Sequence, residues 1–195
     1  MKKTVCLLSV CCVLLGGCLG DILAPREDPS RFYITTSSEK QSPAVSDFDG
    51  EVSLLLAPLP GYLARTQIAT LSSDGSVDIS EFNRWVEAPE GMFARTLERC
   101  MVKNMPKAAV YQYPVVMRQK GRKFCDVRVF IGDCIGALGG RLDFSARWIT
   151  TVSGSEPQMH SFAASRSAGK GYAGYVAAVS ECLAELSAEI SKSIK

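Results

Sequence analysis

Histidine is almost absent from this sequence: its 195 residues include one, His160. Common zinc sites use two or more histidines or a group of cysteines, so we expect no resident metal and no cofactor. A surplus of charge is also missing, because 22 basic residues oppose 20 acidic ones and leave a formal net charge of +2. Nucleic-acid binding needs a basic surface, so no nucleic-acid partner is expected.

The sequence motifs of common enzyme classes are missing as well. No Gly-x-Ser-x-Gly motif is present to hold a serine nucleophile. The segment Gly169-Lys170-Gly171 lacks the first glycine and the final Ser/Thr of a phosphate-binding loop. His160 is interpreted as an exposed or strand-edge residue, and three aspartates are interpreted as ordinary surface acids: Asp126, Asp133 and Asp143. The sequence therefore predicts a protein that is not an enzyme.

The longest apolar run near the N-terminus is too short to span a membrane. It covers residues 5–15, whereas a transmembrane helix needs about 20 residues. Its length is typical of the hydrophobic part of a signal peptide. The segment Leu15-Gly16-Gly17-Cys18 that ends it resembles a bacterial lipobox, in which the cysteine thiol receives a diacylglycerol. We expect residues 1–17 to be a lipoprotein signal peptide and Cys18 to be lipidated; an ordinary secretory leader is the alternative.

Cleavage before Cys18 changes both charge and location. It removes Lys2 and Lys3 and no acidic residue, so the formal net charge falls from +2 to zero. Acyl chains on Cys18 give stable membrane anchoring. Leu19, and not Asp, follows the cysteine, and the sorting rule of enterobacterial lipoproteins then predicts the outer membrane, with the protein facing the periplasm.

The mature chain is predicted to contain a tether over residues 18–30 and a single α+β domain over residues 31–195. Prolines and the absence of hydrophobic periodicity indicate the tether. Apolar residues at helical spacing predict helices over 90–105 and 172–195. Alternating or β-rich segments predict strands, listed here in order: 31–36, 52–57, 67–71, 76–79, 109–113, 124–131, 142–148 and 159–165. The expected fold is a mixed, mostly antiparallel sheet with the two amphipathic helices packed on one face.

Two connecting segments receive predictions of their own. Ser80 is a plausible N-cap, so a short helix is expected through Val86. Residues 132–140 contain four glycines and are expected to form a flexible loop between two strands.

Four cysteines remain beyond the leader and Cys18: Cys100, Cys125, Cys134 and Cys182. An oxidising compartment permits two disulfides among them in three connectivities. A Cys125–Cys134 link would fix the glycine-rich loop. Free, buried cysteines that act as small hydrophobic residues are the competing interpretation. The pairing stays open.

A basic cluster precedes the strand predicted at 124–131. It consists of Arg118, Lys120, Arg122 and Lys123. The simplest interpretation is a solvated turn. The functional hypothesis is contact with anionic lipid head groups or with an acidic partner.

Five segments in order resemble the ABC-type transport auxiliary lipoprotein family, the PqiC/YmbA-like lipoproteins of MCE transport systems. They follow the lipobox Cys18 and are Phe32-Tyr33-Ile34, the Leu-Pro-Gly-Tyr-Leu-Ala-Arg-Thr-Gln-Ile stretch at 59–68, the Glu-Phe-Asn-Arg-Trp-Val-Glu stretch at 81–87, the Gly-Gly to Trp segment at 139–148, and the helix through residues 183–190. The resemblance covers residues 18–194.

The resemblance implies a role in envelope transport without catalysis. Such lipoproteins work with an MCE-domain protein and an ABC or permease system that moves lipids or other hydrophobic compounds, and they support membrane integrity. The resemblance also implies a homo-oligomer, with a ring as one arrangement. Interface-type residues in the matching segments are candidates for partner contact: Tyr62, Arg65, Arg84 and Trp85. Tyr62 and Trp85 could instead fill the core. A structural or peptidoglycan-binding lipoprotein and an envelope hydrolase are the alternative functions.

Overall fold

The structure is a computed structural model that describes residues 28–37, 46–114 and 118–195. The signal peptide expected at residues 1–17, the lipidated Cys18 and most of the tether lie outside the described residues. Within the described ranges, no helix combines the length and apolar character that crossing a membrane would need.

The described residues form eight strands and two helices, which confirms the α+β class. In chain order they are β1 (Arg31–Tyr33), β2 (Glu51–Leu56), β3 (Gln67–Leu71), β4 (Val77–Trp85), α2 (Pro89–Asn104), β5 (Ala109–Gln112), β6 (Phe124–Gly136), β7 (Arg141–Val152), β8 (Gln158–Ser167) and α3 (Gly171–Ser193).

The strands divide between two sheets, whereas the sequence predicted one. The larger sheet has the order β5-β2-β6-β7-β8, and the smaller has the order β1-β4-β3. β2 runs parallel to both of its neighbours, while β6, β7 and β8 are antiparallel. In the smaller sheet β1 is parallel to β4, and β3 and β4 form a hairpin. The larger sheet is mixed, as predicted.

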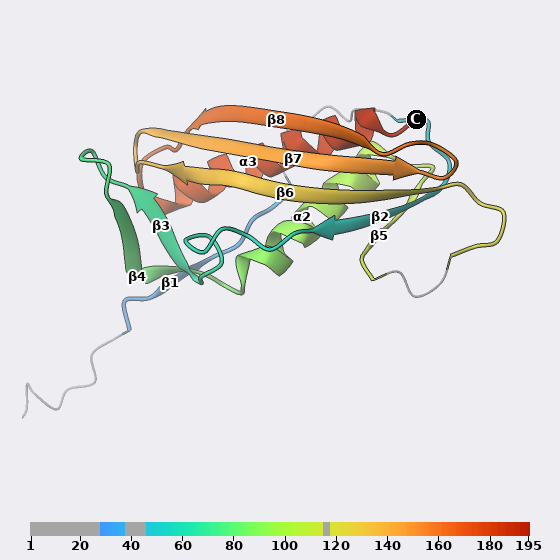
Figure 1. Cartoon of the computed structure of the whole chain (residues 1–195). Helices are drawn as coiled ribbons and strands as arrows, with labels where there is room; N and C mark the ends of the chain where they lie inside the picture. The colour runs from blue at the N-terminus through green and yellow to red at the C-terminus, as the bar shows by residue number, and fades with distance from the viewer. Residues whose placement is uncertain (1–27, 38–45, 115–117) are drawn as a thin grey trace, which may run out of the picture.

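Both helices lie on one face of the larger sheet, as the sequence predicted (Figure 1). Alternation along β6 explains why: Val127 and Val129 are buried toward the helices, while Arg128 between them is exposed. α3 fits against this face with a stripe of fully buried side chains that includes Leu183 and Leu186. Each such side chain contributes about 1.5–3 kcal/mol by leaving water, so this layer is the main source of stability.

The short helix predicted from Ser80 to Val86 is wrong, because β4 continues through Trp85. The local signal is present: the Ser80 hydroxyl accepts a hydrogen bond from the Asn83 backbone N–H at 2.9 Å, as an N-cap would. In the structure this hydrogen bond spans the part of β4 that lies out of regular register with β3, where the pairing shifts between Gln67 and Ala69. Pairing with the distant β1 then keeps the segment extended.

The flexible loop predicted at 132–140 is also wrong, because β6 extends to Gly136. A register shift between Ile131 and Asp133 marks a β-bulge at Gly132. Before the bulge the odd-numbered residues are buried, and after it Cys134 and Gly136 are buried instead. At Gly136 the neighbouring backbone lies so close that an added Cβ would stand 2.1 Å from the Arg141 carbonyl oxygen. These glycines therefore serve close strand packing.

Candidate functional site

The chemistry-bearing residues do not gather into a metal site in the described part of the chain, where no group of three or more His, Cys, Asp or Glu is placed to hold an ion. His160 lies on β8 and stacks on the Trp148 ring, with centroids 5.1 Å apart. Its Nε2 lies 3.2 Å from the Thr150 hydroxyl. These contacts hold the imidazole against the strand next to it.

Trp85, a candidate interface residue, is buried in the core. Its side chain is 4% exposed and packs edge-on against Phe93 of α2, with ring centroids 5.8 Å apart. The indole ring therefore joins the end of β4 to α2. In this fold it cannot present its ring to a partner, which matches the core-filling alternative considered from the sequence.

The other three candidate interface residues lie at or near the surface. Tyr62 is half-buried, and its hydroxyl accepts a hydrogen bond from the Cys134 backbone N–H at 3.2 Å. Burial raises the pKa of the Tyr62 phenol. Arg65 is exposed. Arg84 is half-buried, and its Nε donates to the Glu81 carbonyl oxygen at 2.7 Å. Tyr62 thus has a structural contact, while the two arginines keep surface for a partner.

The basic cluster of Arg118, Lys120, Arg122 and Lys123 occupies the segment that leads into β6. Arg118 pairs with Asp126 and stacks on the Phe124 ring, 3.9 Å from its centroid. Arg122 pairs with Asp49 at 3.0 Å. Both lysines are exposed. Two of the four charges are therefore balanced by acids, and the lysines carry the remaining positive charge outward.

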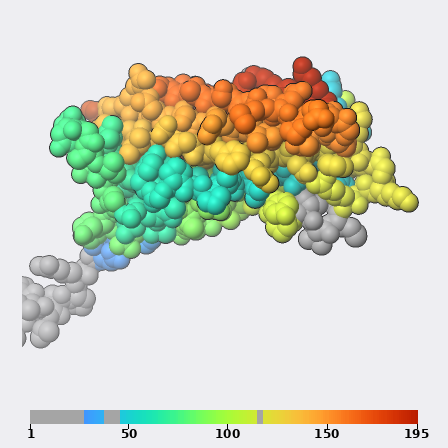
Figure 2. All heavy atoms as spheres, viewed as in Figure 1, coloured from blue at the N-terminus to red at the C-terminus, as the bar shows by residue number. Residues whose placement is uncertain are grey.

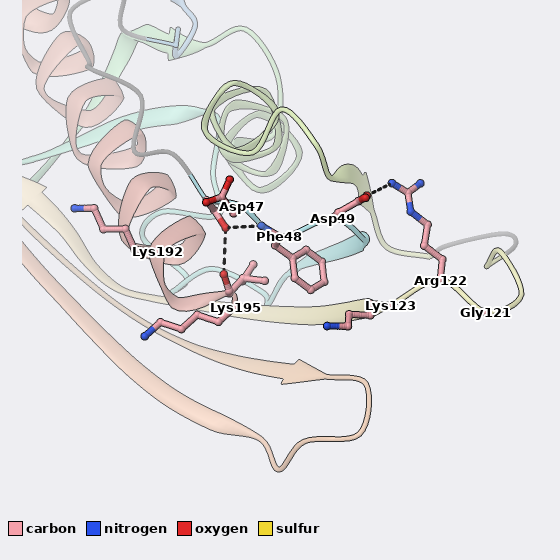
Figure 3. A pocket seen from close by; sticks show the side chains of 10 residues that line it. Asp47, Phe48, Asp49, Gly121, Arg122, Lys123, Lys192 and Lys195 are labelled. Atoms are coloured by element: carbon pink, nitrogen blue, oxygen red, sulfur yellow. Dashed lines mark hydrogen bonds and ion pairs between the residues drawn. The ribbon is translucent and has the colours of Figure 1, made fainter.

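A hollow of about 840 Å³ lies beside this cluster, at the C-terminal end of α3. Figure 3 shows its residues coming from three places: the segment before β2, the segment before β6, and the end of α3. The Phe48 ring lies between the Lys123 and Lys195 side chains in this view. Six charged residues line the hollow: Asp47, Asp49, Arg122, Lys123, Lys192 and Lys195. Four of these six are cations, so we call it the basic hollow. The sequence did not predict it, because its residues come from three segments far apart in the chain.

All four described cysteines are free thiols and buried. Cys125 and Cys134 lie on the same strand, β6, nine residues apart, so their Cα atoms are about 30 Å apart and no disulfide can join them. Burial raises the pKa of Cys125 and of Cys182 to about 12. The thiols therefore behave in this structure as small hydrophobic residues, the competing interpretation considered from the sequence.

The smaller sheet presents an apolar surface that the sequence analysis missed. Across it Phe32 pairs with Arg84, and Leu71 pairs with Val77. Gln67, Ala69 and Leu71 lie on one face of β3 and pair with Arg84, Ile79 and Val77, so these partners share a face of the sheet with Phe32. Trp85, the neighbour of Arg84, points the other way, into the core. Six exposed side chains make up this outer apolar face: Phe32, Ile34, Leu71, Val77, Ile79 and Val86. The alternation of Val77 and Ile79 after the Asp-Gly turn was the available signal.

These observations define a class: an α+β domain with two helices on one face of a mixed sheet, with a charged hollow at one end and exposed apolar side chains on a smaller sheet. A family model described as the ABC-type transport auxiliary lipoprotein component matches residues 34–191, and the chain belongs to this family. The family associates it with ABC-type transport as an auxiliary lipoprotein of the cell envelope. No curated protein matches the sequence significantly.

Two crystal structures share the fold. One, of an uncharacterized protein, has a TM-score of 0.66 and 19% identity, and the match covers 85% of this chain and 99% of that one. The other, protein XCC0632 from Xanthomonas campestris, of the DUF330 family, has a TM-score of 0.63 and 12% identity, covering 82% and 92%. At these identities the likeness concerns the fold.

Proposed function

We propose that this protein is the non-enzymatic, outer-membrane-anchored lipoprotein of an ABC/MCE-type envelope transport system. It docks a conduit for lipids or other hydrophobic compounds to the outer membrane and supports membrane integrity. The observation that carries the proposal is the family match over residues 34–191, which spans nearly every described element.

Features of the chain support this role. The lipobox at Leu15–Cys18 provides a membrane anchor at the N-terminus. The basic cluster and the basic hollow lie where β6 begins and α3 ends, and they suit an acidic surface on an MCE-domain protein. Several copies arranged as a homo-oligomer, such as a ring, would surround or adjoin one conduit.

The test combines lipid labelling with crosslinking in cells. Wild-type protein is expected to incorporate labelled palmitate, to fractionate with the outer membrane and to co-purify with an MCE-domain protein after crosslinking. Cys18→Ala is expected to lose the label. Cys100→Ala, which alters a buried thiol, is the matched control and should keep it. Labelled, crosslinked protein that brings down no MCE-domain protein would sink the proposal.

A further inference from the structure

The outer apolar face differs from the other solvent-facing sheet surface of the molecule. On the larger sheet the side away from the helices carries charges at alternate positions, among them Asp126, Arg128 and Arg147, as a solvated face does. On the smaller sheet the six apolar side chains are 36% to 62% exposed. Among the residues that the strand pairings place on that face, Arg84 alone is charged. A group of exposed apolar side chains on one sheet face is a candidate binding surface.

The position of this face in the chain points to what covers it. β1 is the first described strand, and Phe32 lies on it. Only residues 19–30 separate Arg31 from Cys18, a span of at most about 45 Å when fully extended. Figure 2 shows β1 and the β3–β4 hairpin at the same end of the molecule, with the hairpin projecting from it. An anchor on Cys18 therefore keeps β1 within about 45 Å of the membrane surface.

We propose that the outer apolar face inserts into the surface of the lipid bilayer that holds the anchor. The inference rests on the lipidation of Cys18 included in the proposed function. Aliphatic and aromatic side chains enter the boundary between head groups and acyl chains, and the Arg84 guanidinium can meet lipid phosphates there. A second contact beside the acyl anchor fixes the orientation of the domain. The basic hollow, at the other end of α3, then faces the periplasm (Figure 1).

The experiment reads membrane depth at two labelled positions. Full-length, lipidated Ile79→Cys protein carries an environment-sensitive dye and is reconstituted in vesicles of phosphatidylethanolamine and phosphatidylglycerol. Met159→Cys is the matched control, because Met159 is also apolar and exposed but lies on β8 of the larger sheet. The four described native cysteines are buried and the Cys18 thiol is taken up by the lipid, so the label goes to the new thiol. Brominated lipids are expected to quench position 79 at least about twofold more than position 159.

The outcomes separate this inference from the function it rests on. Equal quenching at positions 79 and 159, in protein whose Cys18 carries labelled palmitate, overturns insertion and leaves the anchor intact. Crosslinking between two copies through position 79, without quenching, also overturns it, because the face would then be an interface between copies. Loss of the palmitate label counts against the proposed function instead. Each variant alters an exposed side chain, so both are expected to fold normally, and circular dichroism checks this.

Discussion

At the residue scale, the buried thiols link stability to alkaline pH. Burial holds the pKa of Cys125 and Cys182 at about 12 in the folded protein, whereas an unfolded thiol ionises near pH 8.5. Above pH 8.5 the unfolded chain therefore binds fewer protons than the folded protein, and the free energy of unfolding falls as the pH rises. The contribution is fully present below about pH 8.5 and is lost between there and pH 12.

Cys182→Ala isolates this effect. The substitution is expected to destabilise at pH 7.5 because it removes a fully buried side chain from α3, and this penalty should shrink by about 1–2 kcal/mol at pH 10. Urea unfolding at the two pH values measures it. Val179→Ala in the same helix creates a similar cavity without a titrating group, so its penalty should stay constant. A pH-independent penalty for Cys182→Ala would contradict the assigned ionisation.

At the scale of elements, each helix contains a glycine near its start, but only the glycine in α3 lacks room for a side chain. Gly174, in the first turns of α3, lies so close to the preceding turn that an added Cβ would stand 2.7 Å from the Ala168 carbonyl oxygen and 2.9 Å from Gly169 Cα. Both obstacles are backbone, so they cannot rotate away. Gly91 in α2 has room, because the nearest atom is the end of the flexible Arg95 side chain at 3.4 Å.

Alanine at these two positions should therefore change stability in opposite directions. Gly174→Ala is expected to cost about 1–3 kcal/mol as α3 moves away from the turn. Gly91→Ala is expected to stabilise by about 0.4–1 kcal/mol, because alanine loses less backbone entropy in a helix. Chemical denaturation of both variants gives the two values. A stabilising Gly174→Ala would show that α3 does not begin against this turn.

Elements governed by local periodicity were predictable from the sequence. The apolar stripe of α3 and the alternation in β6 and β7 each specify one buried face. α3 and β7 lie within four residues of their predicted bounds, and β6 begins where predicted. The errors arose where a non-local partner decides. Pairing with β1 keeps residues 83–85 extended, and the bulge at Gly132 breaks the alternation after Ile131, where the sequence predicted the end of the strand.

The candidate site was less predictable, because surface and core residues look alike in a sequence. Trp85 carries the chemistry of an interface hot spot, yet β4 ends by placing it against α2. The basic hollow joins residues near positions 48, 122 and 195, which only the completed fold brings together. Of the basic cluster, the sequence identified the members but not that Asp49 and Asp126 balance the two arginines.

At the scale of the whole molecule, the ends have different surfaces. β1 and the β3–β4 hairpin lie at one end, and the segment that leads into β6 lies at the other (Figure 1). The proposed docking role agrees with this polarity, with the apolar end placed at the lipid and the charged end at the partner protein. Charge at the partner end sets the association rate and its dependence on salt.

Charge reversal at that end is the last test. Lys120 and Lys123 are exposed, so the double variant K120E/K123E is expected to fold normally and to bind the MCE-domain protein about tenfold more weakly at low salt. The double variant R31E/K170E changes the net charge by the same amount at the opposite end of the molecule, where both residues are exposed, and should bind like wild type. Surface plasmon resonance at two salt concentrations gives both affinities. Equal loss of affinity in both variants would mean that the total charge of the protein, and not the position of the lysines near β6, determines binding.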